Sequence, residues 1–151
     1  MQRTVKGDLS PLELDAWRGL LRTHARLVRE LDHELVAAHG LPLTSYEVLI
    51  ALADAPGERL RMSEVADSLL LSQSGITRLV DRLERDGLVR REPCEEDGRG
   101  LYAALTPHGR AALRAARATH LAGVRRRFLD PLSDRELSSL AGAWRRVLDA
   151  G

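Results

Sequence analysis

The sequence predicts a mainly α-helical protein that carries one small β-wing. Apolar residues recur at helical spacing along most of the chain. Aromatic residues make up only 3% of it, which favours a core of Leu, Val and Ala between helices over a β-sandwich. Two strand-like runs, 88–93 and 101–106, flank a tip with Gly98 and Gly100, as is typical of a hairpin.

The segment 71–106 is the centre of this organisation. Its first part predicts an amphipathic helix that Ser72 caps and that Gly87 ends in a left-handed turn. The apolar face of this helix consists of Ile76, Leu79, Val80 and Leu83. A shorter helix over 60–70 precedes it and the hairpin follows it, so the segment has the plan of a winged helix-turn-helix.

Helices are also expected on both sides of this segment. Pairs of a hydroxyl residue and a Glu three positions later predict capping boxes at the starts of three helices. These pairs are Ser10 with Glu13, Thr44 with Glu47, and Ser133 with Glu136. Thr106 and Pro107 read as the cap and first residue of a further long helix that extends to Phe128.

The first long helix carries an apolar stripe that predicts self-association. Residues 17, 24 and 31, and likewise 21, 28 and 35, repeat every seven positions, as in a coiled-coil seam. We therefore expect one integrated domain with three regions. These are a flexible arm (1–9), a helical dimerisation region (10–40 and 107–151) and a winged helix-turn-helix DNA-binding region (41–106).

Composition limits the class of protein. With one cysteine, Cys94, the chain can form neither an intramolecular disulfide nor a site with several cysteine ligands. No apolar run approaches the length of a membrane span and the start of the chain lacks a signal core, so we expect a soluble protein of the cytoplasm. The net charge of +1 gives no sign of nucleic-acid binding.

The wing resembles that of a known family. Asp97, Gly98 and Arg99, followed after five residues by Leu105 and Thr106, resemble the D-x-R-x5-L-T signature of the MarR family of winged helix-turn-helix bacterial transcription regulators. Further residues stand where that family places them: Glu64, Val65, Ala66, Leu79, Val80, Leu83, Glu84, Gly87, Leu88, Val89, Pro107 and Gly109. Arg61 departs from the pattern, because the family usually has a Thr or Ser cap there.

The resemblance implies a homodimer that binds a pseudopalindromic site in double-stranded DNA and acts as a repressor. It also implies that a small molecule, aromatic or anionic, releases this repressor from the DNA. It implies no cofactor and no membrane partner. It also implies a place in the bacterial cytoplasm, on the nucleoid when the protein is bound to DNA. The residues expected in the major groove are Ser72, Gln73, Ser74, Thr77, Arg78 and Arg82. Arg99, positioned by Asp97, is expected in the minor groove. Trp17, His24 and Tyr46 are candidates for the effector pocket, with simple core packing as the alternative.

Other interpretations remain open at this point. Arg78 and Arg82 could pair with Asp81 and Glu84 on a solvated face. Because segment 71–106 has nearly balanced charge, the protein could also be a winged-helix dimer that serves mainly as a protein-interaction module. A metal-responsive regulator using its histidines, or a redox-responsive one using Cys94, is a further alternative. An enzyme has little support, since the chain contains no Gly-rich phosphate loop and no nucleophile motif.

Overall fold

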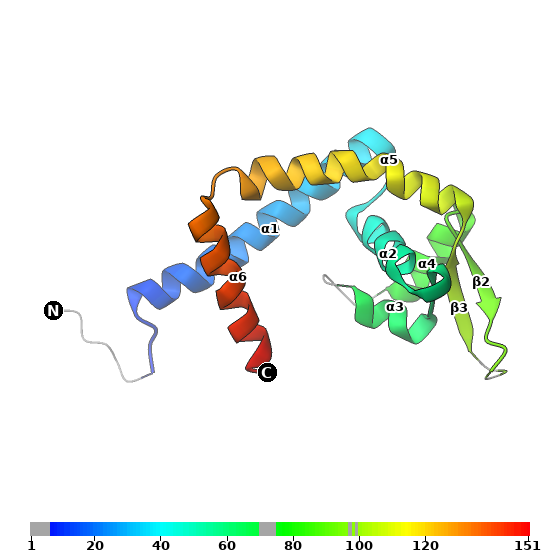
Figure 1. Ribbon diagram of the computed structural model, residues 1–151, viewed down its shortest axis with the longest axis horizontal. Helices are drawn as coiled ribbons and strands as arrows, with labels where there is room; N and C mark the ends of the chain where they lie inside the picture. Colours follow the sequence, from blue (N-terminus) through cyan, green and yellow to red (C-terminus); the bar gives the residue numbers. More distant parts are fainter. Residues whose placement is uncertain (1–6, 70–74, 97, 99) are drawn as a thin grey trace. The chain divides into compact units, whose positions relative to one another are not determined.

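A computed structural model describes residues 7–69, 75–96, 98 and 100–151 (Figure 1). Its elements are α1 (Pro11–His39), α2 (Leu43–Asp54), a short 3-10 turn (Pro56–Glu58), β1 (Arg59–Arg61), α3 (Met62–Ser68), α4 (Ile76–Arg85), β2 (Val89–Pro93), β3 (Leu101–Leu105), α5 (Pro107–Val124), a π turn (Arg125–Leu129) and α6 (Asp134–Asp149). The expectation of a mainly helical protein with a small β-wing is confirmed.

The chain forms two compact units. The first contains residues 1–31 and 124–151, and the second contains residues 32–123. The second unit therefore holds the end of α1, all of α2 to α4, the sheet, and α5 up to Gly123. The predicted division into arm, dimerisation region and DNA-binding region concerns function and stays a prediction.

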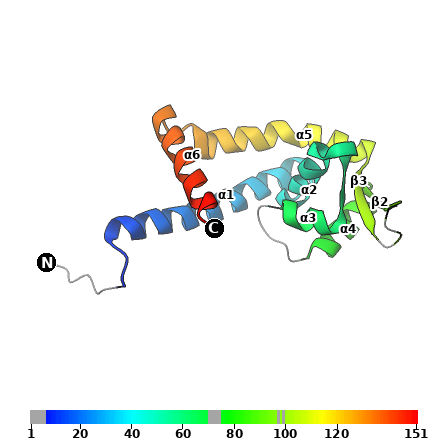
Figure 2. The same cartoon turned by 60° about the horizontal axis from the view of Figure 1, so that its bottom comes forward.

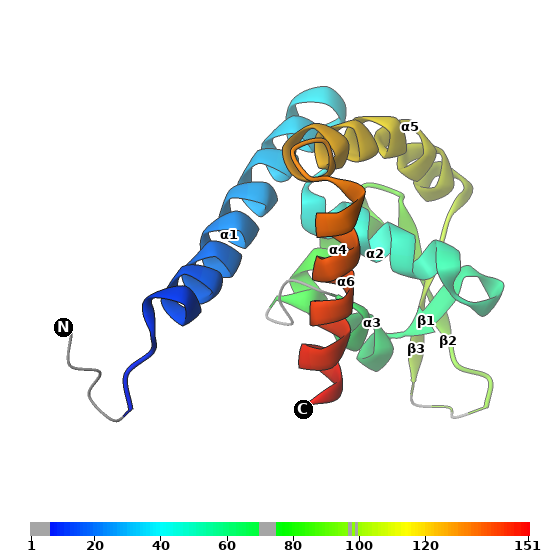
Figure 3. The same ribbon diagram turned by 60° about the vertical axis from the view of Figure 1, so that its left-hand side comes forward.

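The second unit is organised around α2 and the sheet. The strand order is β1-β3-β2 with antiparallel pairing throughout, and Ala103 of β3 lies opposite Leu60 on one side and Arg91 on the other (Figure 3). Helix α3 packs on β1 and β3, and α4 packs on β2 (Figure 2). The fully buried side chains of this core are mainly aliphatic: Leu35, Tyr46, Val48, Leu49, Leu52, Val65, Val80, Leu83 and Val89. This composition matches the prediction of a core built from Leu, Val and Ala.

Of the five predicted caps, those at Ser10, Thr106 and Ser133 are present, whereas Gly75 and not Ser72 is the cap residue of α4. Ser10 and Glu13 form the reciprocal bonds of a capping box at 2.7 and 3.3 Å, and Ser133 and Glu136 do so at 2.8 and 3.3 Å. The Thr106 hydroxyl accepts a bond of 2.9 Å from the backbone N–H of Gly109.

The predicted cap of Thr44 with Glu47 is wrong. Helix α2 begins two residues earlier than a Thr44 cap would place it, at Leu43 after Pro42, with no side-chain bond from its own cap residue. The backbone N–H of Leu43 instead donates to the Asp32 carboxylate of α1 at 2.8 Å. Since a partner eleven residues upstream satisfies the helix start, Glu47 is free for another role.

Two element boundaries also differ from expectation. The helix predicted over 60–70 begins only at Met62, because Arg59–Arg61 joins β3 as a third strand. Glu64 accepts from the backbone N–H of Arg61 at 2.8 Å, so the carboxylate half of a cap forms although Arg61 has no acceptor to offer. The α-helical part of the α5 run ends at Val124, and a π turn closed by the bond from Asp130 N–H to the Arg125 carbonyl at 2.8 Å continues it up to Pro131.

The first unit buries little of its apolar surface. Among its described hydrophobic residues only Leu31 is buried, whereas Trp17, Trp144 and Leu148 are 53%, 38% and 78% exposed. Glu30 of α1 binds two guanidinium groups, those of Arg26 and Arg127. Within the described ranges no single helix is long and apolar enough to cross a membrane, although α1 and α2 taken as a bent pair have the length and composition.

Candidate nucleic-acid interface

Helix α4 separates an apolar face from a polar one, as the sequence predicts. Ile76, Val80 and Leu83 are buried against the rest of the unit. Thr77, Arg78 and Arg82 are exposed on the opposite side. A ten-residue amphipathic helix with its polar face outward has the form of a helix that can enter a DNA groove.

Several predicted DNA contacts lie outside the described residues. These are Ser72, Gln73, Ser74, Asp97 and Arg99. The structure does describe what flanks them. Helix α4 starts after Gly75 in the left-handed region at φ 78°, and the bond from Cys94 N–H to the Gly100 carbonyl at 2.9 Å closes the hairpin beside its tip.

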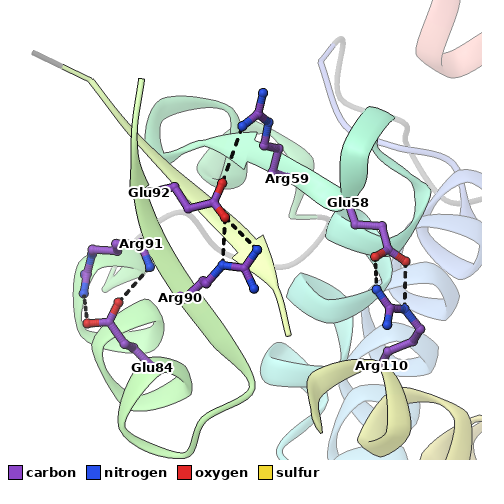
Figure 4. A network of polar contacts seen from close by, with 7 residues as sticks. All are labelled: Glu58, Arg59, Glu84, Arg90, Arg91, Glu92 and Arg110. Atoms are coloured by element: carbon purple, nitrogen blue, oxygen red, sulfur yellow. Dashed lines mark hydrogen bonds and ion pairs between the residues drawn. The ribbon is translucent and has the colours of Figure 1, made fainter. Parts of the chain in front are cut away.

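Arg91 of β2 joins the wing to α4 through both acidic residues of the helix's polar side. Its guanidinium binds Asp81 at 2.6 Å and Glu84 at 3.2 Å, and its backbone N–H donates to Glu84 at 3.0 Å (Figure 4 shows the pair with Glu84). The bond to Asp81 raises the pKa of the Arg91 guanidinium above its ordinary value. Arg91 thus binds both carboxylates of the helix by charge-assisted bonds, and its single positive charge offsets one of their two negative charges.

A second cluster of ion pairs surrounds Glu92, the acidic residue of β2. Glu92 accepts from Arg90 at 2.7 Å and from Arg59 of β1 at 3.4 Å (Figure 4). The bond from Arg90, supported by Arg59, lowers the pKa of the Glu92 carboxyl. Arg59 also lies 4.5 Å above the ring of Tyr102, which fixes it over the sheet. The sequence analysis did not identify Arg59 or Arg91 as organising residues.

These ion pairs show which charges of segment 71–106 are already paired within the protein. Segment 71–106 has nearly equal numbers of acids and arginines, but the structure pairs Asp81, Glu84 and Glu92 with Arg59, Arg90 and Arg91. Within the described part of the chain, the side chains of Arg78 and Arg82 form neither a hydrogen bond nor an ion pair. Asp81 and Glu84 therefore pair with Arg91 and not, as in the alternative interpretation, with Arg78 and Arg82. The exposed face of α4 is cationic although the segment as a whole is not.

The end of α4 is fixed to both the wing and α5. Gly87 has a φ of 72°, as predicted for the residue that ends the helix, and the N–H of Leu88 donates back to the Leu83 carbonyl at 2.9 Å. The Thr106 hydroxyl donates to the Gly87 carbonyl at 2.6 Å, and its backbone N–H donates to the Leu88 carbonyl at 3.2 Å. Glu58 and Arg110 add a two-bond ion pair between the 3-10 turn and α5 (Figure 4).

A cavity of about 530 Å³ lies within the same unit beside α2, which supplies half of its lining, while β1, α3 and α5 contribute Leu60, Ser68 and His120. Tyr46, a candidate for the effector pocket, lines this cavity, and its ring centroid lies 4.6 Å from that of His120. Burial raises the pKa of the Glu47 carboxyl and lowers the pKa of the His120 imidazole. Trp17 and His24 belong to the first unit, and their part in an effector pocket stays a prediction.

The metal and redox alternatives gain no support. In the ranges that the structure covers, no three His, Cys, Asp or Glu residues are grouped to hold a metal ion. Cys94 is a free thiol that is 2% exposed, whereas reactive thiols need access to solvent.

Comparison with known proteins gives the family. A model described as the MarR family matches residues 39–100. The transcriptional regulator PrsX of Escherichia coli is 36% identical over 89 residues, 59% of this chain and 53% of PrsX. The transcriptional repressor YetL of Bacillus subtilis is 32% identical over 100 residues, 66% of this chain and 59% of YetL. The matched part of the chain thus spans little more than half the length of these relatives.

Solved structures match over nearly the whole chain. AbsC, a MarR family transcriptional regulator from Streptomyces coelicolor, is 37% identical with a TM-score of 0.86, covering 95% of this chain and 96% of AbsC. Another MarR family regulator from that organism, solved in complex with DNA, is 35% identical with a TM-score of 0.87, covering 95% of this chain and 90% of the other. The chain therefore belongs to the MarR family of transcriptional regulators, which are not enzymes.

Proposed function

We propose that the protein is a dimeric, sequence-specific DNA-binding repressor that acts in the bacterial cytoplasm on the nucleoid. The observation that carries this proposal is the ion pairing of Arg91 with Asp81 and Glu84, which leaves Arg78 and Arg82 exposed on α4. Unpaired guanidinium groups on an exposed helix face can bind phosphates or the acceptor edge of guanine. The relative solved with DNA supports the same use of the fold.

Each lobe of the dimer would place α4 in the major groove, with the wing beside the adjoining minor groove. Since a twofold dimer presents two identical helices, the target is a pseudopalindrome with its half-sites about one helical turn apart, or a multiple of that. Ser72, Gln73, Ser74 and Thr77 would complete the major-groove set at the start of the helix.

Selection of bound sites from random duplexes tests this proposal. Recovery of a palindromic sequence, bound more tightly than random DNA with a steep salt dependence, is the expected result. A protein-interaction module would yield no enriched sequence. The nearly neutral charge balance of segment 71–106 favoured that alternative, but Asp81, Glu84 and Glu92 are paired within the protein, which weakens its motive.

Dimerisation is proposed from the first unit. The first unit exposes large apolar side chains on two helices and buries few others. They are Trp17, Leu20 and Leu21 of α1 and Trp144, Val147 and Leu148 of α6. Exposed apolar residues at helical spacing on two helices are best covered by a second copy of the chain.

Removal of residues 137–151 is expected to abolish the stable dimer, because it deletes the whole apolar face of α6. Light scattering after size-exclusion chromatography measures the mass, and circular dichroism measures the helix content. A milder variant, Leu148→Glu, is expected to weaken the dimer, whereas Arg135→Glu, at an exposed position near the start of α6, is expected to preserve it. A folded, soluble monomer from the truncated chain contradicts this architecture.

Arg99→Ala tests the proposed role of the wing. The dimer would lose two cationic contacts in the minor groove, so the slope of log affinity against log salt should flatten by roughly 2. Preference for A·T pairs at the flanks should fade, since groove width rather than a base edge is read there. Asp97→Ala should give a milder form of both effects because the charge of Arg99 remains. Unchanged affinity, slope and flank preference in a folded dimer would make the wing purely structural.

Release from DNA by a small molecule is the last part of the proposal. The cavity beside Tyr46 has a volume within the range of about 300 to 1,000 Å³ that is usual for ligand sites. It lies in the same unit as α4. A ligand there could therefore shift the balance between lobe conformations that bind DNA well or poorly.

A further inference from the structure

Two residues at the cavity beside α2 carry polar atoms that have no partner. Among the described residues, Oε2 of Glu47 and Nδ1 of His120 are the buried side-chain atoms that make no hydrogen bond. Both residues line the cavity. Leaving a buried polar atom unpaired costs free energy, so two of them on residues that line one cavity point to a site whose partner arrives with a ligand.

The charges around the cavity are of one sign. The residues that line it include two carboxyl groups, Glu47 and Asp54, and no Lys or Arg. His120 is neutral at pH 7, because burial lowers the pKa of its imidazole. Arg117 acts on the Tyr46 hydroxyl but does not line the cavity. Among the described lining residues, an anion entering this space would meet two carboxyl groups and no Lys or Arg side chain.

The remaining surface is apolar and aromatic. Ile50, Ala51 and Leu60 supply aliphatic walls, and the rings of Tyr46 and His120 lie together at one side. Such walls favour a lipophilic body of one or two rings. The face of Tyr46 also attracts a cation electrostatically.

We propose that this cavity binds a lipophilic ammonium ion whose N–H groups donate to Glu47 and His120. Glu47 supplies the carboxylate that pairs with the ammonium, and the neutral His120 ring supplies a nitrogen acceptor. Burial raises the pKa of the Glu47 carboxyl. A bound cation lowers that pKa again, because it favours the ionised carboxylate. Any proton on Glu47 then passes to solvent. This differs from the aromatic anion that the family resemblance implies.

The proposal deepens the effector part of the proposed function and rests on it only in treating the cavity as the effector site. Binding is therefore measured on the full-length dimer without DNA, by calorimetry. The probes are naphthylmethylamine, naphthylmethanol and naphthoate, which share a ring system and differ in the charge of the head group. The amine is expected to bind most tightly and the naphthoate most weakly.

Glu47→Gln is expected to lower the affinity for the amine by about tenfold or more, since it removes one charge-assisted bond, and to change the affinity for the alcohol by less than about twofold. The matched control is Asp54→Asn, which removes the same charge from an exposed carboxylate of α2 at the cavity. Asp54→Asn is expected to change the affinity for the amine by no more than about twofold, because solvent screens the charge of this exposed carboxylate. His120→Phe keeps a ring beside Tyr46 and should also weaken binding of the amine.

Three results would overturn the proposal. They are tightest binding by naphthoate, absence of amine binding to the folded dimer, and equal losses in Glu47→Gln and Asp54→Asn. The ranking of the three probes by affinity for the unaltered protein tests the proposal even if a variant fails to fold. Selection of DNA sites is a separate measurement, so the ligand proposal and the repressor proposal can fail independently.

Discussion

Replacing Arg78 and Arg82 together with alanine is expected to abolish sequence-specific DNA binding while the dimer stays folded. Both side chains are exposed, and neither holds a partner within the described structure, so their loss leaves no buried charge behind. A guanidinium that contacts a base contributes about 1 to 3 kcal/mol. With four such groups per dimer, the loss is at least about 4 kcal/mol, or roughly a thousandfold in affinity.

Fluorescence anisotropy with the selected palindrome at several salt concentrations measures this effect. The matched control is Arg18→Ala with Arg22→Ala, which removes the same charge at the same spacing from an exposed stretch of α1. Light scattering should show that both variants remain dimers. If the two double variants lose the same affinity, overall charge and not the face of α4 is responsible, and the recognition proposal fails.

Local signals in the sequence predicted most of the fold. Capping boxes at Ser10 and Ser133 need only residues three positions apart, and both form. Gly87 ends α4 at positive φ because the left-handed region costs glycine nothing. The wing strands follow from two short runs around glycines. Each of these features is decided within a few residues, so a single sequence contains the necessary information.

The wrong predictions depended on distant partners. Thr44 and Glu47 have the spacing of a capping box, but Asp32 on α1 satisfies the start of α2 instead. Arg59–Arg61 is too short to show a strand pattern by itself and becomes β1 only because β3 is available for pairing. Tertiary contacts outweigh local propensity at both places.

The candidate site shows the same limit. The sequence identified the polar face of α4, but counting charges in segment 71–106 could not show which acids were already paired. Arg91 binds two of them from a strand seven to ten positions away in the chain. The unpaired atoms of Glu47 and His120 were missed for a similar reason, because the two residues are brought to one cavity only by the packing of α5 on α2.

Gly109→Ala is expected to produce the largest loss of stability of any single substitution considered. Gly109 lies in the first turn of α5, where an added Cβ would come within 2.0 Å of the Leu88 carbonyl oxygen and 2.9 Å of the Leu105 side chain. The first neighbour is backbone and cannot rotate away. The two segments must therefore move apart, which also strains the bond from Thr106 N–H to the same carbonyl. Overpacking of this kind costs about 3 kcal/mol or more.

Thermal unfolding measures this loss, which should lower Tm by about 6 to 12 °C in a chain of this size. Gly19→Ala is the matched control, since Gly19 lies within α1 and an added Cβ there meets nothing within 4 Å. It should leave stability unchanged or raise it by up to about 1 kcal/mol, the helix propensity of alanine over glycine. Because Leu88 follows the turn that ends α4, Gly109→Ala should also weaken DNA binding at temperatures where the protein remains folded. Equal Tm values for the two variants would show that α5 can shift away from the wing at little cost, and that this junction does not fix the position of α4.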